Sequence, residues 1–133
     1  MTRYFISAGW PYLYDVPGLH NCVPMLFADV YARYRRLRGD QVFYLCGGDE
    51  HGSRVEYVAR GYHKHPQELV DEKYRATVPL LEEMGISLDR FGRTSDPGHK
   101  AFVRDFLVDL WERKKLVANR MSVPYCPSCS KHL

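Results

Sequence analysis

The chain has 133 residues, of which 45% are hydrophobic and 26% are charged, and its formal net charge is +3. This length suits one soluble domain with an ordinary hydrophobic core. The mild charge is mixed along the sequence and makes only a weak case for nucleic acid binding. We find no long apolar run, no signal-peptide core and too few cysteines for a secreted disulfide scaffold. We therefore expect a cytoplasmic protein that does not enter a membrane.

The first part of the chain predicts a strand, a helix and a second strand. Residues 3–8 and 41–46 have the composition of buried strands. Between them, apolar residues recur at helical spacing over 23–37, and Gly39 follows where a C-terminal cap belongs. This order predicts two parallel strands joined by a right-handed crossover.

The remainder continues the alternation of helices and extended segments. Apolar spacing predicts helices over 55–61 and 66–84, and a third helix that starts at Asp96-Pro97. Residues 86–93 form a strand or an extended link, and 116–125 are extended. The expected fold class is α/β, as the first half of a doubly wound, parallel-sheet, Rossmann-like nucleotide-binding domain.

Ligands of an open parallel sheet bind beyond the carboxyl ends of its strands, which points to residues 9–21 and 47–52. Five motifs follow one another in these segments and beyond: Trp10-Pro11-Tyr12, Gly18-Leu19-His20-Asn21, Cys46-Gly47-Gly48-Asp49-Glu50-His51-Gly52, Phe91-Gly92-Arg93-Thr94 and Tyr125-Cys126-Pro127-Ser128-Cys129. In this order they resemble the motifs of the methionyl-tRNA synthetases, which are class I aminoacyl-tRNA synthetases. The resemblance implies a ligase that forms an aminoacyl-adenylate from ATP and an amino acid and transfers the amino acid to tRNA.

The family's phosphate-binding signature, His-x-Gly-His or His-x-Gly-Asn, corresponds to residues 18–21. The resemblance implies that Mg-ATP is bound by Pro17, Gly18, His20 and Asn21, with His20 and Asn21 as the catalytic pair. A helix N-terminus suits phosphates, because its free N–H groups and dipole attract anions. In this sequence His and Gly have exchanged places within the signature.

This exchange predicts weak adenylate formation. Two residues along a helix are about half a turn apart, so His20 should point away from the phosphate that a histidine at position 18 would bind. Losing one such donor costs about 2.7–4 kcal/mol, or roughly a hundred- to thousandfold in rate. The alternative is that Gly18 and His20 form only a loop and a helix cap.

The resemblance also implies an amino acid site formed by Gly9, Trp10, Tyr12 and Asp49. Asp49 would bind the ammonium group of methionine or a related small amino acid, since charge-assisted hydrogen bonds are stronger than neutral ones. The alternative is an acid in a solvated loop, and the flanking Gly-Gly and His-Gly favour the binding role.

Cys126 and Cys129 have the spacing of one half of a zinc site, because two intervening residues let both thiolates reach one tetrahedral ion. We therefore expect two parts: residues 1–115 as the N-terminal half of the catalytic domain, and 116–133 as the start of a zinc-binding insertion. The chain alone should not aminoacylate. It should need a missing C-terminal half or a second polypeptide, and the intact protein should bind tRNA.

Two alternatives to the ligase follow from the altered signature. One is a degenerate synthetase paralogue that keeps an amino acid site for a regulatory role. The other is a retasked synthetase-like domain that activates an amino acid for a non-ribosomal acceptor.

Overall fold

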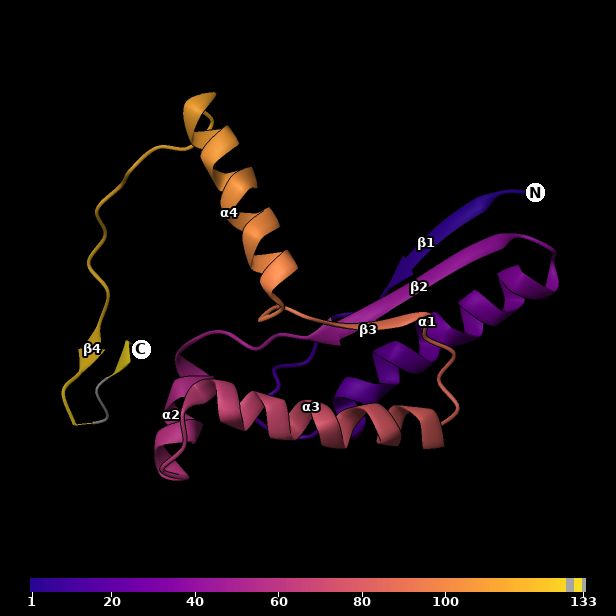
Figure 1. The fold of residues 1–133 in the computed structure, drawn as a ribbon, viewed down its shortest axis with the longest axis horizontal. Helices are drawn as coiled ribbons and strands as arrows, with labels where there is room; N and C mark the ends of the chain where they lie inside the picture. The colour runs from indigo at the N-terminus through magenta and orange to yellow at the C-terminus, as the bar shows by residue number, and fades with distance from the viewer. Residues whose placement is uncertain (129–130, 133) are drawn as a thin grey trace. The chain divides into compact units, whose positions relative to one another are not determined.

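The structure is a computed structural model, and it describes residues 1–128, 131 and 132 (Figure 1). The chain divides into two compact units, Met1–Ser95 and Asp96–Leu133. The first unit contains three parallel strands, which are β1 (Arg3–Ser7), β2 (Gln41–Gly48) and β3 (Arg90–Arg93). Their order in the sheet is β1-β2-β3. The α/β class with a parallel, Rossmann-like sheet is confirmed.

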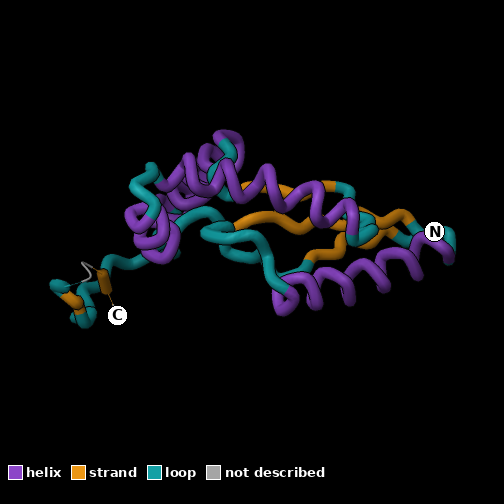
Figure 2. Tube along the Cα trace, turned by 90° about the horizontal axis from the view of Figure 1, so that it is seen from below, coloured by secondary structure: helices purple, strands orange, loops and turns teal. Residues whose placement is uncertain are grey.

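Two helices cover one face of this sheet, α1 (Leu19–Leu37) and α3 (Pro66–Glu83). The connections from β1 to β2 and from β2 to β3 run in the same direction across the sheet. Because crossovers between parallel strands are right-handed, both helices lie on the same face. Figure 1 shows both helices on the same side of the strands, and in Figure 2, which is seen from that side, the strands run between the two helices. Between them the strand residues Ile6 and Tyr44 pack against Met25 and Leu81.

Alternate strand residues point to the opposite face. Phe5 and Phe43 are paired in register across β1 and β2, and their rings stack with centroids 6.2 Å apart. They remain 68% and 46% exposed. Strand alternation therefore gives this sheet one buried face and one open aromatic face.

Helix α1 begins four residues before the position predicted from apolar spacing. Its N-cap is Gly18, which is extended (φ −78°, ψ 178°) and forms no side-chain cap hydrogen bond. His20 is the second residue of α1, so it is not the helix cap of the alternative prediction. Pro24 lies inside the helix and cannot donate to the carbonyl of His20. At the other end Gly39 has φ +80°, as its predicted capping position requires.

The arginines of α1 tie the helix to the segment that leads into β3. Arg36 donates to the Ser87 side chain (2.7 Å) and to Asp89 (2.8 Å). Asp29 is buried and accepts from the Ser87 N–H (2.7 Å) and from Arg33 Nε (2.7 Å). Burial acts to raise the pKa of Asp29, but a hydrogen bond from the Ser87 hydroxyl together with these two outweighs burial and holds the pKa below its usual range.

A short helix, α2 (Ser53–Gly61), packs on α3 through a second apolar cluster that includes Val55 and Leu69. Helix α3 starts with a capping box. Gln67 N–H donates to His65 Nδ1 (3.2 Å), and the His65 N–H donates to Glu68 Oε2 (3.0 Å). Only Arg90–Arg93 of the predicted segment 86–93 forms a strand.

The second unit contains α4 (Pro97–Glu112) and a short antiparallel pair, β4 (Tyr125–Cys126) and β5 (Lys131–His132). Asp96 caps α4, as predicted, by accepting from the N–H groups of Gly98 (2.8 Å) and His99 (3.3 Å). Among the described residues, no helix is long and apolar enough to cross a membrane.

Candidate ligand site at the carboxyl ends of the strands

The loop that follows β1 lies directly beside the end of β2. The Asp49 N–H donates to the Pro11 carbonyl (2.8 Å), and the Leu13 N–H donates to the Asp49 carbonyl (2.9 Å). Tyr12 and Asp49 thereby form an isolated parallel bridge. The structure thus brings together two of the residues predicted for the amino acid site.

Trp10 lies against the carboxyl ends of the strands, over two glycines. A Cβ atom at Gly47 would lie 2.5 Å from Trp10 Cζ3, and one at Gly92 would lie 3.0 Å from Trp10 Cη2. Real Cβ atoms do not come as close to other atoms as 2.5 Å, so Gly47 needs glycine while the indole stays there. The distance at Gly92 is tighter than most real Cβ contacts, so a side chain there would require the indole to shift. Gly9 adjoins this group, because its carbonyl accepts from the Cys46 thiol (3.9 Å). All four residues predicted for the amino acid site therefore lie at the ends of β1 and β2.

The Asp49 side chain has few partners. Its Oδ1 accepts from the His51 N–H at 3.4 Å, which is a weak hydrogen bond. Within residues 1–128, no Lys, Arg or His side chain forms an ion pair with Asp49. The backbone of Asp49 is held on both sides, whereas its carboxylate is available to a cationic ligand.

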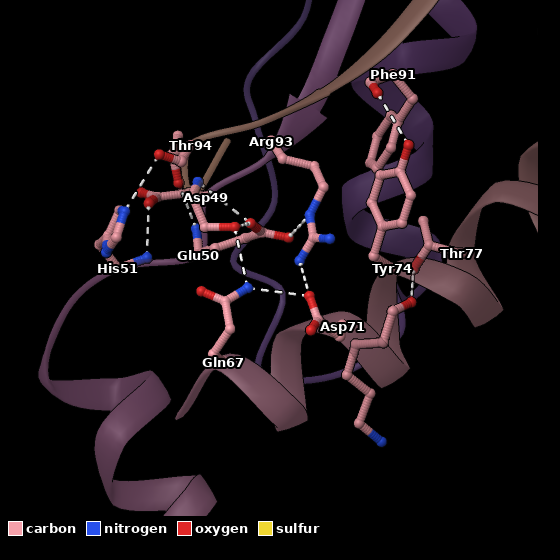
Figure 3. Close-up of polar contacts among 12 residues, drawn as sticks. Asp49, Glu50, His51, Gln67, Asp71, Tyr74, Thr77, Phe91, Arg93 and Thr94 are labelled. Carbon is pink, nitrogen blue, oxygen red and sulfur yellow. Dashed lines mark hydrogen bonds and ion pairs between the residues drawn. The ribbon is translucent and has the colours of Figure 1, made fainter. Parts of the chain in front are cut away.

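Next to Asp49, a polar network joins the ends of β2 and β3 to α3 (Figure 3). The Glu50 side chain is fully buried and accepts from Arg93 Nε (2.7 Å), from the Ser95 hydroxyl and from the Ser95 N–H (3.3 Å). Arg93 reaches further with its second nitrogen, Nη2, to Asp71 of α3 (2.5 Å). One guanidinium thus bridges two carboxylates from different elements, which its rigid fork of donors allows.

The charges of this network shift two pKa values. The hydrogen bond from Arg93 is the main reason that the pKa of Asp71 lies below its usual value. Burial acts to lower the pKa of Arg93, but the hydrogen bonds that it donates to Glu50 and Asp71 outweigh burial and raise that pKa. This network was not predicted from the sequence, although the motifs at 46–52 and 91–94 contain Glu50 and Arg93. The linking residue, Asp71, is in neither motif.

The predicted phosphate-binding residues lie at the start of α1. Pro17 is buried, Asn21 is half-buried and His20 is exposed. A Cβ atom at Gly18 would lie 3.4 Å from both Cε1 and Nδ1 of His20. The imidazole therefore folds back toward the space where a residue 18 side chain would begin. This differs from the prediction that His20 points half a turn away, because a flexible side chain can reach back along the helix while its Cα cannot.

The two predicted zinc ligands have different outcomes. Cys126 lies in β4, whereas Cys129 falls outside the described residues. In the part of the chain that the structure describes, no group of three or more His, Cys, Asp or Glu residues could hold a metal ion. Cys22 and Cys46 are buried in the core, and burial raises the pKa of both thiols.

Comparison with protein families matches residues 4–133 to the family described as tRNA synthetases class I (M). The methionine–tRNA ligase of Aeropyrum pernix is 41% identical over 127 residues, which are 95% of this chain and 22% of that protein. The cytoplasmic methionine–tRNA ligase of Arabidopsis thaliana is 40% identical over 96% of this chain and 16% of its own length. The chain therefore spans about a fifth of the length of the curated relatives that it matches.

Two solved synthetase structures also resemble this chain. Mycobacterium tuberculosis methionyl-tRNA synthetase in complex with methionyl-adenylate matches with a TM-score of 0.76 and 28% identity, over 86% of this chain and 22% of that one. A leucyl-tRNA synthetase from Agrobacterium radiobacter K84, in a ternary complex with tRNA, matches with a TM-score of 0.87 over 99% of this chain and 17% of that one. It is 18% identical and supports the fold alone.

Proposed function

Because this chain belongs to the methionine-type class I tRNA synthetases, we propose that the protein containing it activates methionine with ATP and transfers the methionine to tRNA. The observation that carries the proposal is Asp49. Its backbone N–H and carbonyl are both hydrogen-bonded to the loop after β1, at Pro11 and Leu13, and its carboxylate has no cationic partner among residues 1–128. Such a group suits the ammonium of an amino acid, because it offers a charge-assisted hydrogen bond at a fixed position.

Around that carboxylate, Gly9, Trp10 and Tyr12 are the other proposed contacts of the amino acid. Tyr12 is 55% exposed and lies next to Asp49, so its ring is available to a ligand. Trp10 would form an apolar wall against the strand ends, which suits an unbranched thioether side chain. The complex of the related synthetase from Mycobacterium tuberculosis with methionyl-adenylate supports methionine as the amino acid.

For ATP, we propose a site at the start of α1 formed by Pro17, Gly18, His20 and Asn21, with His20 and Asn21 catalytic. In doubly wound sheets the strand order reverses beside β1, and nucleotides bind at that switch point, where a helix N-terminus receives the phosphates. The His20 ring lies next to Gly18, which supports the proposal that His20 replaces the histidine of the family's signature. His20 would supply the hydrogen bond donor that the family's signature has at position 18.

The remaining partners belong to the same proposal. ATP would bind with Mg, tRNA would bind the intact protein, and the cytoplasm would be its location, as in the name of the Arabidopsis relative. Residues 1–115 would belong to the catalytic domain and 116–133 to a zinc-binding insertion. Cys126 suits such an insertion, because it lies in β4, which forms a short antiparallel pair with β5.

An amino acid binding titration tests the proposal. In the complete gene product, Asp49→Asn should weaken methionine binding about 10- to 150-fold, because a hydrogen bond to a charged group contributes about 1.5–3 kcal/mol. Asp105→Asn, on the exposed surface of α4, is the matched control and should leave binding unchanged. Equal methionine affinity in wild type and Asp49→Asn would rule out Asp49 as the ammonium partner.

A further inference from the structure

The segment that carries Asp49 is fixed by contacts that do not involve Asp49 itself. The Thr94 N–H donates to the Gly48 carbonyl (3.2 Å), and the Glu50 N–H donates to the Thr94 hydroxyl (2.8 Å). His51 Nε2 lies 3.2 Å from the Thr94 carbonyl. The residues on both sides of Asp49 are thus held by the segment that follows β3 (Figure 3).

Arg93 stabilises the segment around Asp49 through its ion pair with Glu50. It forms an ion pair with the fully buried Glu50 and, through its other nitrogen, with Asp71. Gln67 also donates to Asp71 (2.9 Å) and to the Ser95 hydroxyl (3.3 Å), which itself donates to Glu50. A buried carboxylate without a cation would be strongly unfavourable, so Arg93 determines where Glu50 can lie.

We propose that Arg93 is a positioning residue for amino acid binding: through Glu50 it fixes the peptide segment from which the Asp49 carboxylate meets the substrate ammonium group. This inference rests on the proposed function. Arg93 does not touch the amino acid. Its effect on the amino acid is geometric, because Glu50 is the next residue after Asp49 and cannot shift without moving it.

The inference predicts a selective defect. Arg93→Lys keeps the positive charge but cannot reach Glu50 and Asp71 together in the same geometry. In methionine-dependent ATP–pyrophosphate exchange by the complete gene product, this variant should raise the KM for methionine about tenfold, the loss expected for one poorly aligned hydrogen bond. The KM for ATP and kcat should stay within about twofold of wild type. Arg113→Lys, in the exposed Arg113–Asp109 pair of α4, is the matched control.

A second measurement separates positioning from general damage. Inhibition constants are compared for methionine amide, which keeps the α-ammonium group, and for the analogue of methionine that lacks its amino group. A displaced Asp49 should reduce the preference for the ammonium compound in Arg93→Lys. A merely structural role would reduce the active fraction and leave both KM values and this preference unchanged, and that result would overturn the inference.

Thr94→Val is the milder variant if Arg93→Lys fails to fold, because it removes only the hydroxyl that accepts from the Glu50 N–H. It should shift the methionine KM in the same direction by about threefold. An unchanged methionine KM in the folded variants would contradict the positioning role while the proposed function stands. No methionine-dependent exchange in wild type would instead contradict the proposed function.

Discussion

Replacing Gly48 by alanine tests the close approach of the β1 loop to the end of β2, on which the candidate site depends. A Cβ atom at this position would lie 2.5 Å from Cγ of Leu13. Leu13 is completely buried, and its N–H donates to the Asp49 carbonyl, so it has little room to move. Overpacking of this kind costs about 1–3 kcal/mol.

The cost should appear as a lower melting temperature. In a domain of the size of Met1–Ser95, 1 kcal/mol corresponds to about 4–8 °C, so Gly48→Ala should lower Tm by at least about 4 °C in a calorimetric or circular dichroism melt. Gly61→Ala is the control, since a Cβ atom there would meet nothing within 4 Å. Gly61 ends α2, and alanine favours helix by up to about 1 kcal/mol, so this Tm should be unchanged or higher.

The double variant Gly48→Ala/Leu13→Ala identifies the clashing group. Leu13→Ala alone removes buried apolar volume and should cost about 2–5 kcal/mol. If Leu13 is what the new methyl group meets, the double variant should be less destabilised than the sum of the two single variants, by about 0.5–3 kcal/mol. Strictly additive losses, or a Gly48→Ala melt that matches Gly61→Ala, would refute the close packing at this end of the sheet.

Three further predictions concern other parts of the chain. Arg93 lowers the pKa of Asp71 below the ordinary value of about 3.9, so the stability from this carboxylate is present above about pH 4 and is lost as pH falls through the folded-state pKa. Acid titration of the unfolding free energy should therefore be shallower in Asp71→Asn, and an identical titration would contradict the Arg93 contact. Phe5→Thr should lower the unfolding free energy by no more than about 1 kcal/mol and raise solubility, because Phe5 is exposed and threonine suits a strand; a loss above about 3 kcal/mol in a denaturant melt would mean that Phe5 is core. Cys126→Ser should lower the zinc content of the complete gene product, measured by elemental analysis, and an unchanged zinc content would exclude this ligand.

The fold was largely predictable because its signals are local. Periodic apolar residues and the glycines at their ends define the helices, and the glycine-terminated apolar runs define β1 and β2. The start of α1 was missed because Gly18 offers no capping side chain and Pro24 resembles a break in the helix. The extension of β2 through Gly47 and Gly48 was not predicted, because glycine ordinarily favours turns over strands. Here the two glycines remain in the strand because Trp10 and Leu13 occupy the space that their side chains would take.

The candidate site was predictable only as positions along the chain. The motifs placed Trp10, Tyr12 and Asp49 at strand ends, and the structure brings them together. The network around Arg93 could not be predicted, because Glu50 and Asp71 are 43 and 22 residues away from it in sequence. The orientation of the His20 ring could not be predicted either. Helical spacing fixes the direction of the Cα–Cβ bond but not the side-chain rotamer.

The most direct test of the proposed function is methionine-dependent ATP–pyrophosphate exchange by the complete gene product, measured for wild type, His20→Ala and the exchanged variant Gly18→His/His20→Gly. We predict exchange in wild type, a fall of about a hundred- to thousandfold in His20→Ala, and exchange in the double variant that restores the family's order of histidine and glycine. Wild-type protein without methionine-dependent exchange, together with a double variant that exchanges robustly, would contradict the proposal and show that the altered signature has abolished ATP chemistry.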